Sequence, residues 1–236
     1  MKKKICVIGG GGFLGSHLVD ELILTNKFDV YVFDYKKNYE NKKAKYTYSD
    51  IREKNKLKNF LKKAHTVYHF AAQADIEVSN KDIINTLDIN ILGTANILDA
   101  CVFNNVKRII FASSIYVYSN KGGFYRISKQ TCESLIEEFC KNSKLKYTNL
   151  RFGSLYGPRS DSRNFIHKTL IQAIKNKKIV RGGDGEEIRQ YIHVRDAALS
   201  CINFLQSKYV NKNIMITGSE SIKIKDLLVM INEIMN

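Results

Sequence analysis

Three side chains, Ser114, Tyr125 and Lys129, form a set able to move a proton to or from an alcohol. Tyr125 and Lys129 are four residues apart, so a helix presents both on the same face. An ammonium group beside a phenol stabilises the phenolate and lowers its pKa toward the range of a general base. Ser114 closes the strand-like run Arg108–Ser113 and would orient the reacting oxygen. The set predicts hydride transfer from an alcohol to a dinucleotide, with Tyr125 accepting the hydroxyl proton.

A glycine-rich turn near the start of the chain supplies the dinucleotide site that this reaction requires. Three glycines at a spacing of three follow the apolar run Ile5–Ile8 and open a helix expected over Phe13–Leu24. The first glycine permits a tight turn, the second lets the backbone approach a pyrophosphate, and the third lets helix and strand pack closely. Free N–H groups at the helix start favour phosphate binding. The residues expected to hold the pyrophosphate are Gly9, Gly12, Phe13, Leu14 and Gly15.

Asp34 follows the second expected strand, Val30–Phe33, where a carboxylate accepts hydrogen bonds from the adenosine ribose. A carboxylate there repels a 2′-phosphate, so NAD is favoured over NADP as the cofactor. Lys36 and Lys37 weaken this preference, because they could pair with a phosphate instead. The alternative is that Asp34 only caps a turn.

Short apolar runs alternate with amphipathic stretches, a pattern typical of parallel strands joined by crossover helices. The sequence therefore predicts an α/β fold, a Rossmann-type doubly wound parallel sheet with a small C-terminal part. We expect the NAD-binding domain over residues 1–158 and a smaller region, packed on it, over residues 159–236. A long helix over residues 83–103 is apolar on more than one face, which predicts burial on both sides. The further elements expected are strands at Val67–Phe70, Tyr147–Arg151 and Ile188–Val194, and helices at Tyr125–Cys140 and Phe165–Lys175.

Composition limits the classes of partner and the compartment. The formal net charge is +15, but the lysines are scattered along the chain among asparagines and isoleucines. This favours a compositional bias over a nucleic-acid surface, with attraction to an anionic ligand as the alternative. Five scattered cysteines suit a reducing cytosol, and no histidine or cysteine spacing predicts a metal. Without a signal peptide or a membrane-length apolar run, we expect a soluble cytoplasmic protein with no nucleic-acid or membrane partner.

Taken together, the motifs resemble the extended short-chain dehydrogenase/reductases, in particular the NAD-dependent sugar-nucleotide epimerase/dehydratase family. The resemblance runs from Lys4 to about Met235. Its further motifs are Ser49–Arg52, His69–Ala72, Asn90–Thr94, Ser113–Ser114, Leu150–Arg159, Gly183–Gly185 and Arg189–Asp196.

This resemblance implies roles for residues that spacing alone does not assign. Asp50 and Ile51 would contact the adenine, and Arg189 would grip the diphosphate of a sugar nucleotide. It further implies a homodimer formed by a four-helix bundle from the 83–103 and Tyr125 helices, with ordinary core packing as the alternative. The residues implied at the nicotinamide end of the cofactor are Phe70, Ala71, Ala72, Asn90, Tyr125 and Lys129.

The chain departs from the family in its substrate half. By this resemblance, residues 159–236 are a partial, truncated sugar-nucleotide-binding and substrate-binding part. Ile115 and Tyr116 stand where 4,6-dehydratases carry the acid and base of elimination, which disfavours a dehydratase. The segment between Ser114 and Tyr125 is short, as in sugar-nucleotide enzymes of bacterial surface-polysaccharide clusters, some of which oxidise GDP-heptose at carbon 4. Ser154 replaces the asparagine expected at a nucleotide contact.

The family resemblance and these departures leave two hypotheses from different classes. The first is an NAD-dependent epimerase or dehydrogenase that oxidises a nucleoside-diphosphate sugar, at carbon 4 by resemblance, in surface-polysaccharide precursor synthesis. The second is a non-catalytic NAD-binding or redox-sensing member of the family, which the short C-terminal part would suit.

Overall fold

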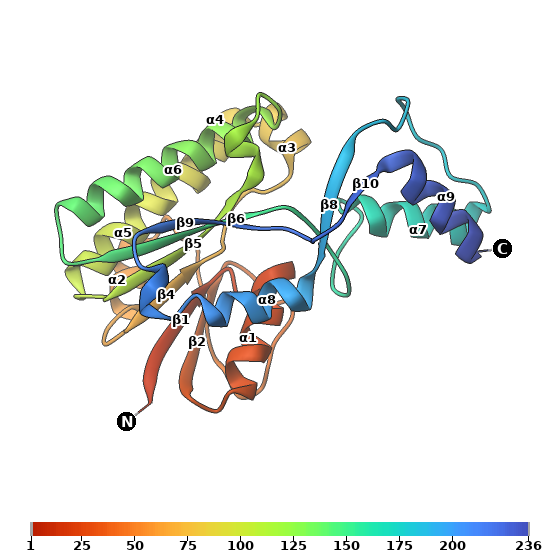
Figure 1. Ribbon diagram of the computed structural model, residues 1–236. Coiled ribbons are helices and arrows are strands. Elements are labelled where there is room, and N and C mark those ends of the chain that lie inside the picture. The colour runs from red at the N-terminus through yellow and green to blue at the C-terminus, as the bar shows by residue number, and fades with distance from the viewer. Residues whose placement is uncertain (1, 236) are drawn as a thin grey trace.

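Seven parallel strands form the main sheet of the protein, as a computed structural model that describes residues 2–235 shows (Figure 1). Their order across the sheet is β3-β2-β1-β4-β5-β6-β9, and every neighbouring pair is parallel. This confirms the predicted Rossmann-type sheet. The strands are β1 (Lys3–Ile8), β2 (Phe28–Asp34), β3 (Lys45–Tyr48), β4 (Thr66–His69), β5 (Arg108–Ser114), β6 (Lys146–Phe152) and β9 (Lys212–Ile216).

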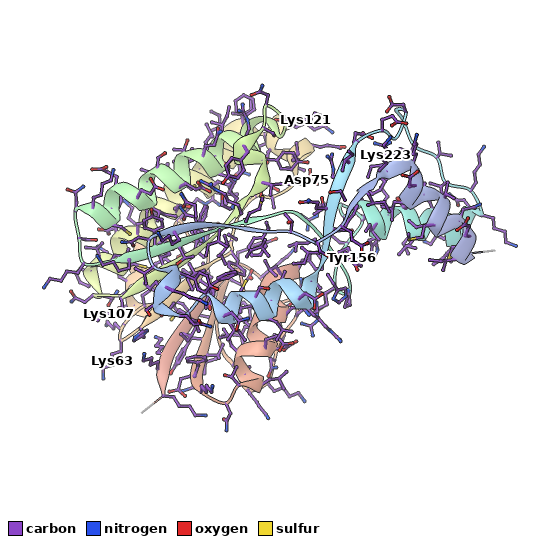
Figure 2. The ribbon with its side chains drawn as sticks, in the orientation of Figure 1. Lys63, Asp75, Lys107, Lys121, Tyr156 and Lys223 are labelled. Atoms are coloured by element: carbon purple, nitrogen blue, oxygen red, sulfur yellow. The ribbon has the colours of Figure 1, made fainter. Side chains whose placement is uncertain are left out.

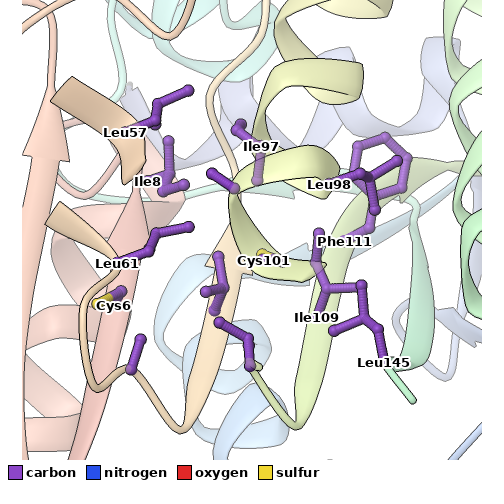
Figure 3. Packing of buried hydrophobic residues seen from close by; sticks show 14 of the residues in the cluster. Cys6, Ile8, Leu57, Leu61, Ile97, Leu98, Cys101, Ile109, Phe111 and Leu145 are labelled. Atoms are coloured by element: carbon purple, nitrogen blue, oxygen red, sulfur yellow. The ribbon is translucent and has the colours of Figure 1, made fainter. Parts of the chain in front are cut away.

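Helices cover both faces of this sheet and bury its apolar side chains. One face packs against α2 (Lys54–Phe60), α5 (Gly93–Phe103) and α6 (Gly123–Lys141) through a core that Figure 3 shows. The other face packs against α1 (Phe13–Leu24) and α8 (Val194–Asn203). Strands buried on both faces explain why their sequences are continuously apolar rather than alternating. All five cysteines are buried and unpaired within these layers.

The helix expected over residues 83–103 is present and contains a π-helical turn. It consists of α4 (Ile83–Leu87), a π-helical turn (Asp88–Leu92) and α5, preceded by the short helix α3 (Ile76–Lys81). The wider turn rotates Asn90 into the protein, where its carbonyl oxygen accepts hydrogen bonds from the Thr94 hydroxyl and the Cys132 thiol. Burial on both sides was also expected, yet Ile84 is 78% and Leu92 56% exposed. By length and composition this stretch could cross a membrane, but half of it is buried against the sheet.

A smaller sheet and two helices lie to one side of the main sheet (Figure 1). The strand order is β10-β8-β7, and α7 packs on α9 around Ala173, Leu227 and Ile231. The bounds are β7 (Ser154–Tyr156), α7 (Phe165–Asn176), β8 (Ile188–His193), β10 (Ser221–Lys223) and α9 (Ile224–Met235).

The chain does not divide between the sheets at residue 158, the boundary expected from the sequence. β7 already belongs to the small sheet, and residues 194–216 return to the large one as α8 and β9. Two of the crossings between the sheets lie side by side, because the Gly153 N–H donates to the Ile216 carbonyl at 2.9 Å. A side chain at Gly153 would meet Thr217, and one at Gly218 would meet the Tyr191 carbonyl.

Core packing beneath α5 predicts a large cost for a cavity there. Leu98 is fully buried against Ile109 and its neighbours, so Leu98→Ala should lower the free energy of unfolding by about 2–5 kcal/mol. Urea denaturation measures this change. Leu24→Ala, at a position 75% exposed on α1, is the matched control and should change it by less than about 0.5 kcal/mol. Equal effects of the two substitutions would contradict the packing described.

Candidate active site

The glycine turn lies at the carboxyl edge of the large sheet, between β1 and α1. Gly9 has φ +86°, and a Cβ there would lie 2.4 Å from the backbone nitrogen of Ala71. A Cβ at Gly15 would lie 2.1 Å from the Gly9 carbonyl oxygen. Both positions therefore exclude any side chain, since the turn, the helix and the segment after β4 pass within backbone contact.

Gly12 differs because its outer side is open. It precedes the first residue of α1, and a Cβ on it would meet only the Gly9 oxygen, at 3.3 Å. Within the described chain no side chain caps this helix, so the N–H groups of its first turn, Phe13 and Leu14 included, are free for a ligand. An open backbone cradle at a helix N-terminus fits a pyrophosphate.

Asp34 and the glycine turn hold each other in place. The buried Asp34 carboxylate accepts a hydrogen bond from the Gly11 N–H at 2.9 Å through Oδ2, and Asn38 Nδ2 donates to the Gly11 carbonyl. Among the described residues, the Lys36 N–H, at 3.5 Å, is the one donor that reaches Oδ1, so this oxygen could accept a further hydrogen bond. Lys37 pairs with Glu40 and the Lys36 ammonium lies over the Tyr35 ring, so local groups engage both lysines.

The segment after β3 carries Asp50 and Ile51, the residues expected to contact the adenine. Both Asp50 carboxylate oxygens accept hydrogen bonds from Arg52, whose guanidinium holds the pKa of that carboxyl below its usual range. Arg52 also pairs with Asp88 at 2.8 Å and so ties this segment to the π-helical turn. Ile51 is buried beside Gly93, where a Cβ would lie 2.4 Å from Ile51 Cδ1.

Asn90 supports the wall formed by residues 70–73 from behind. Its Oδ1 accepts from the Gln73 N–H at 2.7 Å, and its Nδ2 donates to the Gln73 carbonyl and to Ser128 Oγ. The wall itself is fixed to β1, because the Phe70 and Ala71 N–H groups both donate to the Ile8 carbonyl. With its amide engaged by protein groups and 2% exposed, Asn90 holds a supporting position instead of the cofactor contact implied by the resemblance.

The fold brings the three predicted catalytic side chains together at the end of β5. Ser114 is the last residue of this strand, and Tyr125 and Lys129 lie in the first two turns of α6. Lys129 is 3% exposed; its Nζ donates to the Ala112 carbonyl at 2.8 Å and lies 5.7 Å from the centre of the Tyr125 ring. Ser114 Oγ accepts from the Tyr116 N–H.

Burial sets the protonation of this group. It raises the pKa of Tyr125 to about 12, against the opposing effect of a hydrogen bond with Ser114. Burial also lowers the pKa of Lys129 to about 8. The expectation that Lys129 lowers the pKa of Tyr125 is therefore not met here, because the lysine donates to the Ala112 carbonyl and desolvation of the phenolate dominates.

The small sheet carries Ser154 and Arg189, the two residues predicted to bind the substrate. Ser154 pairs with Tyr191 in the register of β7 and β8, and Arg189 lies two residues before Tyr191 on the same strand. The Arg189 side chain makes one hydrogen bond in the described chain, to the Ile188 carbonyl, so its other donors are available.

Three further residues, Tyr116, Arg181 and Tyr191, were not assigned to the site from the sequence. Burial raises the pKa of Tyr191 to about 12, and the charges of Arg189 and Arg181 oppose this rise. Tyr116 adds to the rise in the pKa of both Tyr191 and Tyr125. Arg181 pairs with Glu187, and its buried Nη1 has no partner within residues 2–235. Tyr116 had a sequence signal, because it stands at a position where the family pattern is broken. No spacing rule signals Arg181 or Tyr191.

No group of three histidine, cysteine or acidic side chains within the described range could hold a metal ion. His193 caps the start of α8, and His17 contacts the Pro158 carbonyl at 3.0 Å. Both histidines therefore have structural contacts.

Comparison with known proteins identifies the family. The model of the NAD-dependent epimerase/dehydratase family matches residues 5–216. The chain belongs to this family. It is 32% identical to a putative UDP-glucose 4-epimerase of Methanocaldococcus jannaschii over 92% of this chain and 78% of the relative. These matches also confirm the resemblance to extended short-chain dehydrogenase/reductases.

Solved structures agree with this assignment and with the cofactor. A UDP-glucose 4-epimerase from Thermotoga maritima with UDP-glucose has a TM-score of 0.90 at 27% identity, covering 98% of this chain and 82% of that one. A UDP-glucuronic acid 4-epimerase from Bacillus cereus in complex with UDP-glucuronic acid and NAD has a TM-score of 0.90 at 26% identity, with the same coverage. NAD is accordingly the cofactor of this family member, as Asp34 predicts.

The close packing at Gly15 predicts that a single methyl group damages the cofactor site. Gly15→Ala places a Cβ against the Gly9 carbonyl and should displace the turn, lowering affinity for NADH at least about tenfold. A fluorescence titration with NADH measures this loss. Gly182→Ala is the control, because a Cβ there meets nothing within 4 Å. Unchanged affinity in Gly15→Ala would contradict the site.

Lys129 makes the stability of the cofactor-free protein depend on pH. Its pKa is about 8 in the folded state and ordinarily 10.5, so the unfolded chain binds the proton more tightly. The free energy of unfolding should therefore rise by about 2 kcal/mol from pH 8 to pH 10, and this gain is lost again as the pH falls from 10 to 8. Urea denaturation across this range tests the prediction. Lys129→Met should lack the rise; an equal rise in the variant would refute it.

Proposed function

We propose that this protein is a UDP-sugar 4-epimerase that oxidises the hexose at carbon 4 and returns the hydride to the opposite face. The observation that carries the proposal is the placement of Ser114, Tyr125 and Lys129 beside a complete dinucleotide turn. Relatives and structural neighbours named as UDP-glucose or UDP-glucuronic acid 4-epimerases support the substrate class. The same resemblance leads us to place the product in surface-polysaccharide precursor synthesis in the cytoplasm.

NAD, when bound, supplies the hydride acceptor and a positive charge near Tyr125. The cofactor would lie with its pyrophosphate on Gly9, Gly12, Phe13, Leu14 and Gly15, its ribose on Asp34, and its adenine against Asp50 and Ile51. Phe70, Ala71 and Ala72 would border the nicotinamide ribose. That charge opposes the desolvation that raises the pKa of the phenol, so Tyr125 becomes able to accept the proton of the sugar hydroxyl. Ser114 orients the sugar oxygen, and Lys129 holds positive charge beside the phenolate.

The small sheet would hold the nucleotide and position the sugar. Arg189 offers guanidinium donors for a diphosphate. Arg181 has a buried Nη1 without a partner among the described residues, and its charge and that of Arg189 both act on Tyr191. Ser154 would contribute a hydroxyl in place of the usual amide. Tyr116 and Tyr191 would border the sugar, since Tyr116 acts on the pKa of both Tyr125 and Tyr191.

Elimination chemistry is disfavoured by the same site. A 4,6-dehydratase requires an acid and a base directly after the oxygen-orienting residue, and this chain has Ile115 and Tyr116 there. The intact triad also disfavours the non-catalytic alternative. An epimerase needs only the oxidation and return of hydride that this triad can support.

We further propose that the protein forms a homodimer through α4, α5 and α6. Three large apolar side chains are exposed here: Ile84 on α4 by 78%, Leu92 at the end of the π-helical turn by 56%, and Ile127 on α6 by 40%. Apolar side chains that protrude from helices on one side of a sheet favour helix-on-helix association, as in the four-helix bundle of the family.

Incubation with UDP-glucose tests the proposed reaction. The expected result is UDP-galactose with no net NADH in the absorbance, because each hydride returns to the sugar. Tyr125→Phe removes the proton acceptor and should lower kcat by about 10²–10⁴-fold while NADH affinity is unchanged. Tyr209→Phe, far from the cleft, is the matched control. Stoichiometric NADH would indicate a dehydrogenase, and full activity in Tyr125→Phe would exclude the assigned role.

A further inference from the structure

The amino edge of the large sheet, opposite to the glycine turn, carries a dense positive charge. All seven strands are parallel, so the loops that lead into them lie along this one edge. The last residues of these loops, together with the first residue of each strand, contain thirteen lysines and no aspartate or glutamate. They cover residues 2–3, 25–28, 42–45, 61–66, 104–108, 142–146 and 206–212. Figure 2 shows Lys63 and Lys107 here, with Asp75 and Tyr156 on the other side.

These loops form a fixed surface rather than independent tails. The His65 N–H donates to the Lys4 carbonyl, the Lys107 N–H to the His65 carbonyl, and the Lys146 N–H to the Lys107 carbonyl, at 2.9–3.1 Å. Seven strands about 4.8 Å apart make the edge about 29 Å wide. Burial lowers the pKa of His65, and the positive charges of Lys3 and Lys107 lower it further, so both lysines act on this histidine.

None of the thirteen lysines has a carboxylate partner within 4 Å in the described part of the chain. Five helices, α1, α2, α5, α6 and α8, end at this edge, and a lysine after each would complement the negative end of its dipole. That accounts for about one lysine per helix and leaves most of the set without a structural purpose.

Bulky apolar side chains protrude beside these lysines. Leu24 ends α1 and is 75% exposed, and Phe103 ends α5 and is 64% exposed. The ammonium of Lys58 lies over the Phe103 ring at 4.8 Å. Amphipathic surfaces of lysine with protruding leucine and phenylalanine are typical of proteins that bind at a lipid interface.

We propose that the amino edge of the sheet docks on a membrane surface rich in anionic lipids. A headgroup layer requires diffuse positive charge and takes up apolar side chains, and this edge offers both. Nucleic-acid surfaces rely on arginine for base contacts, whereas Arg108, the arginine of these loops, points inward to Thr148. Docked in this way, the cofactor cleft faces away from the bilayer. The inference is independent of the reaction catalysed.

Sedimentation with lipid vesicles tests the proposal. The full chain should bind vesicles containing about 30% phosphatidylglycerol and not vesicles of phosphatidylcholine alone, because each lysine near an anionic surface contributes about fivefold. Binding should weaken as salt is raised from about 0.1 M to 0.5 M, since screening shortens the reach of the charges. Lys62→Glu/Lys63→Glu/Lys107→Glu should reduce binding at least tenfold, and Phe103→Ser should reduce it at unchanged charge.

The matched control reverses three lysines elsewhere, Lys168, Lys175 and Lys178, and should retain vesicle binding. NADH titration and circular dichroism of each variant establish that the fold is kept. Equal loss in the control would show that net charge alone drives adsorption and would overturn the proposal. So would binding to neutral vesicles, no binding to anionic vesicles, or tighter binding to duplex DNA than to anionic vesicles at the same ionic strength.

Discussion

The backbone contact between Gly9 and Ala71 is the constraint on which the cofactor half of the site depends. A turn at the end of β1 must pass within van der Waals distance of the segment after β4, and only a residue without Cβ permits it. The same closeness lets Gly15 bring α1 onto the turn and lets the Gly11 N–H reach Asp34. Because the Phe70 and Ala71 N–H groups share the Ile8 carbonyl, the nicotinamide wall is fixed by the strand that carries the turn. The glycine turn, Asp34 and the segment after β4 are therefore joined directly to one another.

Electrostatics explains why the catalytic group depends on its cofactor. Without added positive charge, burial favours a neutral phenol at Tyr125 and weakens proton binding by Lys129. Both shifts come from desolvation, and both favour the neutral form of the group. On the proposed function, the positive charge of a bound cofactor would favour the phenolate form of Tyr125. Binding of the cofactor would thereby activate the base.

Much of the large sheet could be predicted from the sequence, because strands buried on both faces are continuous apolar runs. β3 and α2 were missed: β3 is a short edge strand with exposed side chains, and α2 is lysine-rich with only Leu57 and Phe60 buried. The π-helical turn has no sequence period of its own, so the position of Asn90 emerges only from its contacts with Gln73 and Ser128. Lysines scattered along the chain were expected to reflect composition, but seven parallel strands bring many of them to one edge. Tyr191 is placed beside Ser154 only by the pairing of the small sheet, and Arg181 lies in the loop between α7 and β8, which has no sequence period.

The adjacent crossings at Gly153 and Thr217 have a mechanical consequence. The Gly153 N–H donates to the Ile216 carbonyl, so the two crossings run as a hydrogen-bonded pair. His193–Val194 is the third chain connection, and the ion pair between Arg159 and Asp20 also ties the segment after β7 to α1. A side chain in place of Gly153 would meet Thr217, and one in place of Gly218 would meet the Tyr191 carbonyl, so either substitution would force the paired segments apart.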